Sequence, residues 1–166
     1  MPFSALPLPA TEEQKKARQL RLFNDVIFGF AKGLYDLFED SALAAVDTLG
    51  EDILEEMEHE LGLEIHGEDP QDILTEIGRL LVDEYGLCKS ARLVIEGGEI
   101  DAYVEGCLLW KATKDLREAG IPPYTCVPMM MAMAALRKRL GQKAKFVAIK
   151  QDDDKRLCDI DFHLLS

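Results

Sequence analysis

The start of the chain has the hydrophobic periodicity of a helix. Apolar residues recur every three or four positions from Leu20 to Leu37, through Phe23, Ile27, Phe30 and Leu34. Thr11, followed by two glutamates, is a typical helix start, because its hydroxyl can cap the first turn. The pattern predicts a long amphipathic helix with this series as its apolar face.

Two more helices are expected in the first half. Asp40 or Ser41 can cap a second helix, which Gly50 is expected to interrupt. A third helix begins with Asp69 as the cap and Pro70 in the first helical position, and it ends at Gly86.

The second half changes to the alternation of strands. The segment 87–108 contains Gly97-Gly98 at its middle, which predicts a hairpin with a two-residue turn. That register places these residues opposite each other: Ile95 and Ile100, Leu93 and Ala102, Ala91 and Val104, and Cys88 and Cys107. A second hairpin is expected from residues 144–151 and 156–165. With Asp153-Asp154 at its centre, Ile149 lies opposite Cys158 and Val147 opposite Ile160.

Two helices are predicted between the hairpins, at about 108–118 and at 129–140. The segment 121–128 contains three prolines and is expected to be a loop. The expected fold is therefore α+β: a helical N-terminal half, then two antiparallel β-hairpins forming one sheet with helices packed on one face. Residues 1–10 are expected to be a flexible tail, and residues 11–166 a single domain.

The charge balance excludes some partners. The chain has 166 residues, with 31 acidic against 19 basic, a net charge of −12. Such a chain is a poor ligand for nucleic acid or for an anionic membrane surface, because both need clustered cations. No apolar run is long enough to span a bilayer. Four cysteines without an export signal suggest free thiols and a cytoplasmic location.

Cys126 is the most interesting of these thiols. It stands just ahead of a helix, and the positive end of the helix dipole favours the thiolate, which is the nucleophilic and metal-binding form. Packing of a small side chain beneath the proline-rich loop is the plain alternative, and catalysis is the least favoured interpretation. We therefore expect a binding protein rather than an enzyme.

The methionines that follow suit an apolar pocket. Met129, Met130, Met131 and Met133 are flexible and polarisable. Packing of a helix on the sheet is the plainer explanation of the same residues. The residues expected to bind a ligand are Trp110, Tyr124, Cys126, Met130 and Met133.

The segment from about Tyr124 to Leu165 resembles the 4-vinyl-reductase domain family, which also includes predicted hydrocarbon-binding proteins. The residues that carry the resemblance are Thr125-Cys126-Val127-Pro128, the helix, strand and turn after them, and Cys158-Asp159-Ile160-Asp161-Phe162. The resemblance implies a pocket between helices and sheet, and a homodimer.

In relatives that act as sensors, three cysteines and a glutamate hold zinc. Cys126 and Cys158 match the first and last ligands, while the other two positions fall near Val147 and Lys150. A zinc ion would therefore need other groups, with Cys107 as a candidate.

We expect a cytoplasmic domain that binds or senses an apolar, hydrocarbon-like small molecule and has no output domain of its own. The alternatives are a metal- or tetrapyrrole-binding protein that uses Cys126 and Cys158, and a protein-interaction scaffold.

Overall fold

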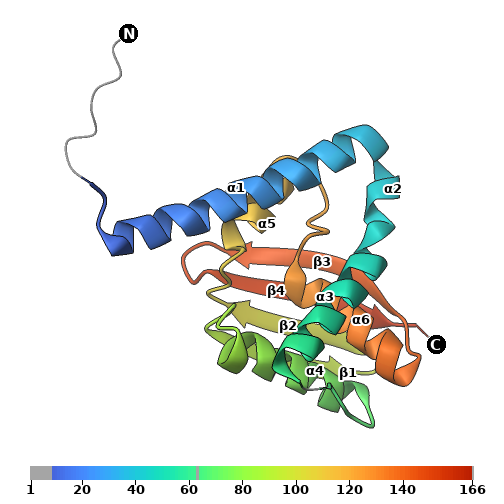
Figure 1. Ribbon diagram of the computed structural model, residues 1–166. Helices are drawn as coiled ribbons and strands as arrows, with labels where there is room; N and C mark the ends of the chain where they lie inside the picture. Colours follow the sequence, from blue (N-terminus) through green and yellow to red (C-terminus); the bar gives the residue numbers. More distant parts are fainter. Residues whose placement is uncertain (1–8, 63, 166) are drawn as a thin grey trace.

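The computed structural model describes residues 9–62 and 64–165 (Figure 1). The helices are α1 (Glu12–Phe38), α2 (Asp40–Leu43), α3 (Ala45–Leu61), α4 (Pro70–Arg79) with the π-helical turn η1 (Leu80–Glu84), α5 (Trp110–Glu118) and α6 (Val127–Leu140). The strands are β1 (Ser90–Glu96), β2 (Glu99–Glu105), β3 (Ala144–Asp152) and β4 (Leu157–Leu164). This order confirms the predicted α+β class. The tail predicted over residues 1–10 lies outside the described residues, except for Pro9 and Ala10. Within the described part of the chain, no helix combines the length and hydropathy needed to cross a membrane.

Helix α1 begins where the sequence predicts. The Thr11 hydroxyl accepts a hydrogen bond from the Gln14 amide at 3.2 Å, and the Gln14 side chain accepts one from the Thr11 amide at 3.0 Å. This reciprocal capping box satisfies two amides at the helix start.

The predicted apolar face of α1 does not face the core. Its buried residues are Asn24 and Ala31, whereas Phe30 and Leu37 of the predicted series are exposed. Hydrogen bonds hold this orientation, among them one from the Tyr124 hydroxyl to the Ala31 carbonyl at 2.6 Å. A buried polar group must find a partner, so these bonds fix the rotation of the helix and leave large apolar side chains outside.

Asn24 joins α1 to the start of α5. Its Nδ2 donates to the carbonyls of Leu20 at 3.0 Å and Leu108 at 2.9 Å, and its Oδ1 accepts from the Ala112 amide at 2.9 Å. The first amides of a helix have no partner within it, and Leu109, which precedes α5, provides no side-chain cap. Asn24 therefore caps α5 from another helix.

The second predicted helix is divided into α2 and α3, and Gly50 does not interrupt α3. A Cβ atom at Gly50 would lie 2.6 Å from the Met130 carbonyl oxygen and 3.3 Å from the Ala134 Cβ. The glycine is therefore needed for the close approach of α3 to α6. Ion pairs flank this contact: Arg137 with Asp47 and Glu51, Lys138 with Glu55, and Arg139 with Glu58.

The two hairpins form one antiparallel sheet with the strand order β1-β2-β4-β3. The predicted register of the first hairpin is confirmed: Ile95 pairs with Ile100, Leu93 with Ala102, and Ala91 with Val104. Gly97 and Gly98 both have positive φ, at 58° and 87°, as a tight turn between two strands requires.

The predicted register of the second hairpin is wrong by two residues. Ile149 pairs with Ile160 rather than with Cys158. The turn is longer than two residues, because β3 ends at Asp152 and β4 starts at Leu157. A bulge between Phe146 and Ala148 then leaves Val147 57% exposed. A shift of two residues keeps each side chain on its face, so Ile160 is buried as predicted.

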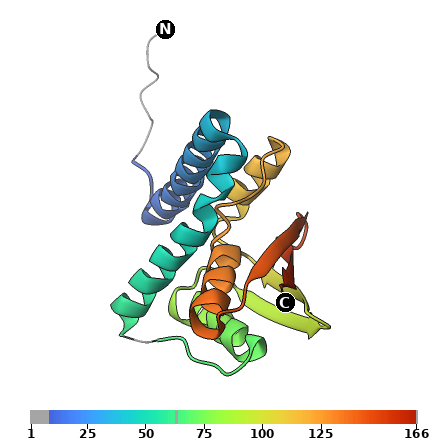
Figure 2. The same ribbon diagram turned by 90° about the vertical axis from the view of Figure 1, so that its right-hand side faces the viewer.

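Helices cover one face of the sheet, as expected. Figure 2 shows α6 between α3 and the sheet, with α4 beside it. Helix α6 starts two residues before the predicted position. Pro128 lies in its first turn, where the missing N–H costs nothing because no helical partner exists there. The opposite face of the sheet carries polar side chains, including Arg92 stacked 4.3 Å over the Tyr103 ring.

Candidate functional site

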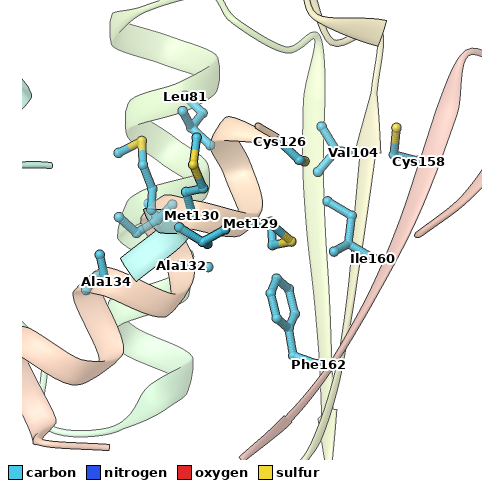
Figure 3. Close-up of a cluster of buried hydrophobic side chains, with 14 of the residues drawn as sticks. Leu81, Val104, Cys126, Met129, Met130, Ala132, Ala134, Cys158, Ile160 and Phe162 are labelled. Carbon is cyan, nitrogen blue, oxygen red and sulfur yellow. The ribbon is translucent and has the colours of Figure 1, made fainter. Parts of the chain in front are cut away.

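A narrow apolar cleft lies between α4 and the inner face of the sheet. Its volume is about 40 Å³. Its walls include Leu74, Ile77 and Leu81 from the helix, Leu93, Val104 and Phe162 from the sheet, and Ala132 from α6. Figure 3 shows Leu81 and Ala132 on the helical side, with Val104, Ile160 and Phe162 on the sheet side. Small-molecule sites are mostly apolar concavities of about 300–1,000 Å³, so this cleft alone can hold only part of a ligand.

The cleft exists because small residues meet there from four elements. Gly78 of α4, Ala91 of β1, Ala102 of β2 and Ala132 of α6 all line it. A Cβ atom at Gly78 would lie 3.5 Å from the Ala91 Cβ, which is ordinary contact. Larger side chains at these positions would close the gap.

The cleft adjoins an open groove between α4 and β1. The groove has a volume of about 410 Å³ and shares Leu74, Gly78, Ala91 and Leu93 with the cleft. Its rim is polar and includes Arg79 and Lys89. Arg79 is held by hydrogen bonds to Glu76 and Glu84, both at 2.8 Å. The Arg79 contact also holds the pKa of Glu76 below its ordinary value.

The helical wall of the cleft follows from local signals in the sequence. Asp69 caps α4 by accepting from the Asp72 amide at 2.9 Å, and the buried Ile73, Ile77, Leu80 and Leu81 follow at helical spacing. The last turn is π-helical: the Tyr85 amide bonds to the Leu80 carbonyl at 3.0 Å. Such turns are rare overall, and many of those that do occur lie at functional sites.

The five residues predicted to bind a ligand lie elsewhere in the core. Trp110, Tyr124, Cys126 and Met130 are buried, and Met133 is partly buried beside a shallow groove of about 340 Å³. None of the five lines the cleft. Sequence reasoning missed the cleft because its residues on α4 and β1 have the pattern of ordinary core positions. The four small residues were the available signal, but only the topology brings them together.

Cys126 occupies the helix start that the sequence predicts, but its surroundings disfavour the thiolate. Burial raises the pKa of the Cys126 thiol, although a hydrogen bond from the Met129 amide acts in the opposite direction. Burial therefore outweighs this hydrogen bond, and the thiol stays protonated at neutral pH. A buried, protonated thiol is a poor nucleophile.

All four cysteines are buried free thiols. Cys88 and Cys107 face each other as predicted, and the hydrogen bond to Cys107 raises the pKa of Cys88, with burial adding to the effect. Burial raises the pKa of Cys158 to about 11, and Gln151 Nε2 donates to its sulfur at 3.7 Å.

The sulfurs of the predicted metal ligands Cys126, Cys158 and Cys107 do not cluster in the part of the chain that the structure describes. Zinc–sulfur bonds of about 2.3 Å place tetrahedral sulfurs about 3.8 Å apart. Among residues 9–62 and 64–165, no three cysteine sulfurs lie within 4.8 Å of one another. Figure 3 shows Cys126 at the start of α6 and Cys158 on β4. Zinc binding by these residues stays a prediction that the arrangement does not favour.

Three carboxylates on the outer face of the sheet do come together. Asp101, Asp159 and Asp161 have oxygens within 4.8 Å of one another. Burial raises the pKa of Asp159, and the charge of Asp161 raises it further. One oxygen of Asp159 has no hydrogen-bond partner, whereas Lys150 pairs with Asp161 at 3.0 Å. The cluster is a site of local electrostatic strain.

Comparison with known proteins gives no family for this chain. No protein-family model matches its sequence, and no curated protein matches it. The resemblance to the 4-vinyl-reductase domain family therefore stays a prediction.

Proposed function

We propose that this protein binds a small, largely apolar molecule between α4 and the sheet. The observation that carries the proposal is the apolar cleft, which continues into a groove with a polar rim. The apolar part of the ligand would enter the cleft, and a polar end would remain at the rim near Lys89. The position resembles small-molecule sites in general, which combine an apolar pocket with a few polar groups.

The size of the cleft limits the ligand. A volume of about 40 Å³ accommodates roughly three water-sized groups, so the rest of the ligand must occupy the groove. Burying about 200 Å² of apolar ligand surface contributes roughly 5 kcal/mol before the costs of association. Net affinities weaker than micromolar are therefore expected for a purely apolar ligand.

The test uses the apolar fluorophore N-phenyl-1-naphthylamine. We expect saturable binding to the full chain with a blue shift and a rise in fluorescence. Ala91→Phe should reduce binding at least tenfold, because Ala91 is exposed at the mouth and lines both cleft and groove. Val94→Phe is the matched control. Val94 lies three positions along the same strand, so its side chain is on the opposite face of the sheet.

Absence of saturable binding would refute the proposal. Equal binding by the wild type and by Ala91→Phe would place the ligand elsewhere. Native mass spectrometry of protein purified without chelator, combined with elemental analysis, adds an independent check. Extra organic mass on a metal-free chain supports the proposal, whereas stoichiometric metal lost in Cys126→Ser would favour the metal-binding alternative.

The proposal includes a homodimer and a reducing compartment such as the cytoplasm. The four free thiols support the compartment. Large apolar side chains exposed along α1 support an interaction surface, because monomers rarely expose contiguous apolar patches of this extent. The same observation favours a scaffold as the second candidate function. A scaffold predicts stable association without binding of the fluorophore.

A further inference from the structure

The outer side of α1 carries an apolar stripe that nothing in the described chain covers. It consists of Leu22, Phe23, Val26, Phe30, Leu34, Leu37 and Phe38. These residues are between 43% and 75% exposed. We call them the outer stripe. Figure 1 shows α1 along one end of the molecule, with α5 beneath it, and Figure 2 shows the same two helices side by side.

The outer stripe is symmetric about Phe30. Val26 and Leu34 lie four positions on either side of it, Phe23 and Leu37 lie seven, and Leu22 and Phe38 lie eight. Residues four, seven and eight apart share a helix face. A two-fold axis perpendicular to α1 at Phe30 therefore places every residue of the stripe opposite another apolar residue of a second copy.

The charges of α1 determine the direction of such a pairing. The segment 15–21 contains Lys15, Lys16, Arg18 and Arg21 and no acid, whereas the segment 36–40 contains Asp36, Glu39 and Asp40 and no base. All of these residues are exposed. Antiparallel helices that cross at Phe30 bring the end of the basic segment, at Arg21, opposite Glu39 in the acidic segment of the other copy. Parallel helices would bring like charges together, which is unfavourable.

The available area is that of a stable interface. Taking about 200 Å² for a fully exposed side chain of this size, the exposed fractions leave roughly 800 Å² of apolar surface on each copy. Standard interfaces bury about 800 Å² per partner. Gly29 and Gly33 flank Phe30 with open space at their Cβ positions, so a second helix can approach closely there.

We infer that the occupant of the outer stripe is a second copy of this chain, with the two α1 helices antiparallel and crossing at Phe30. The inference rests on the homodimer in the proposed function and identifies its surface. The contact is isologous, as two-fold symmetry requires. Both clefts remain open, because α4 and β1 take no part in it.

The first experiment is sedimentation velocity of the full chain across a wide concentration range. We expect a dimer for the wild type. Phe30→Glu should raise the dimer dissociation constant by roughly a hundredfold or more, because two carboxylates then meet at the axis. Phe30 is 72% exposed, so folding should be unaffected, which circular dichroism checks. Val147→Glu, at an exposed valine outside the stripe, is the control and should remain dimeric. An equimolar mixture of Phe30→Glu and Phe30→Lys should dimerise again.

The second experiment fixes the direction. A mixture of Val26→Cys and Leu34→Cys copies should form a disulfide-linked dimer under mild oxidation, and neither variant alone should do so, since antiparallel pairing separates identical positions by about 12 Å. Self-linking of Val26→Cys would indicate parallel helices and overturn the inference. A dimer that survives Phe30→Glu would also overturn it, but would leave the homodimer intact. If the wild type stays monomeric at every concentration, even while it associates with vesicles or with another protein, both the α1 contact and the homodimer are refuted. The ligand-binding proposal would be unaffected.

Discussion

Substitution of Asn24 by alanine should destabilise the protein by about 2–4 kcal/mol. Asn24 is 2% exposed and bridges the Leu108 carbonyl and the Ala112 amide across two helices. Its loss leaves the buried Ala112 amide and the part-buried Leu108 carbonyl without partners, at about 1–3 kcal/mol for the amide and about 1 kcal/mol for the carbonyl. In a chain of this size, each kcal/mol shifts the melting temperature by about 2–4 °C. The expected decrease is therefore roughly 4–16 °C, measured by thermal unfolding and by urea denaturation at a fixed protein concentration.

Asp25 provides the matched control. It lies next to Asn24 and pairs with Lys111 of α5 at 2.7 Å, so it connects the same two helices through an exposed contact. Exposed ion pairs contribute little, and Asp25→Ala should change the stability by less than about 1 kcal/mol.

A small effect of Asn24→Ala would mean that the Leu108 carbonyl and the Ala112 amide find partners without Asn24. Leu108 and Ala112 are four residues apart, the spacing of a helical hydrogen bond. If Asn24→Ala costs less than about 0.5 kcal/mol, the two groups have paired with each other and the bridge is dispensable. Asn24→Asp adds a pH test. Its carboxylate keeps the acceptor but loses the donor, and burial should raise its pKa. Its deficit should therefore shrink as the pH falls and the protonated acid can donate again.

Three further predictions concern single side chains. Gly50→Ala should destabilise the protein by about 1–3 kcal/mol in urea denaturation, because the added methyl overpacks against α6. Gly78→Ala makes ordinary contact only and should stabilise the protein by about 0.5–1 kcal/mol. Equal effects of the two substitutions would contradict the packing argument. Cys126 should react with iodoacetamide at neutral pH far more slowly in the folded than in the urea-unfolded chain, because burial raises its pKa, and rapid labelling in the native state, read by mass spectrometry, would disprove this. Asp159→Asn should raise the stability of the fold at neutral pH. The pKa of Asp159 is raised in the folded state, so its ionisation disfavours the fold. The stability gained by the substitution should therefore fade below about pH 4, where the carboxyl is protonated in both states. A gain that is independent of pH would show another cause.

The sequence predicted the positions of the helices and strands better than it predicted which residues they contact. Capping at Thr11 and Asp69 and the Gly97-Gly98 turn are local signals, and they are confirmed. The register of the second hairpin depended on the length of its turn, which composition does not specify. The bulge at Val147 arises from pairing with a distant strand and leaves no local signal.

The face of α1 could not be predicted from periodicity alone. Apolar residues surround more than half of this helix, so a core-facing side and a partner-facing side overlap in the pattern. The deciding residue is Asn24, which is polar and lies outside the apolar series, yet it points inward because it caps α5. A polar residue beside the predicted apolar face therefore indicated the core, against the usual rule.

The two edges of the sheet have a consequence for solubility. β1 and β3 are the outer strands, and an unpaired strand edge invites addition of strands from other molecules and, ultimately, aggregation. Along β3, Lys145 and Lys150 are exposed and the bulge at Val147 interrupts regular pairing. Lysine and bulges both discourage edge-to-edge growth. With the β3 edge protected in this way, the pairing proposed for α1 would give an assembly that closes at two rather than extending into a fibre.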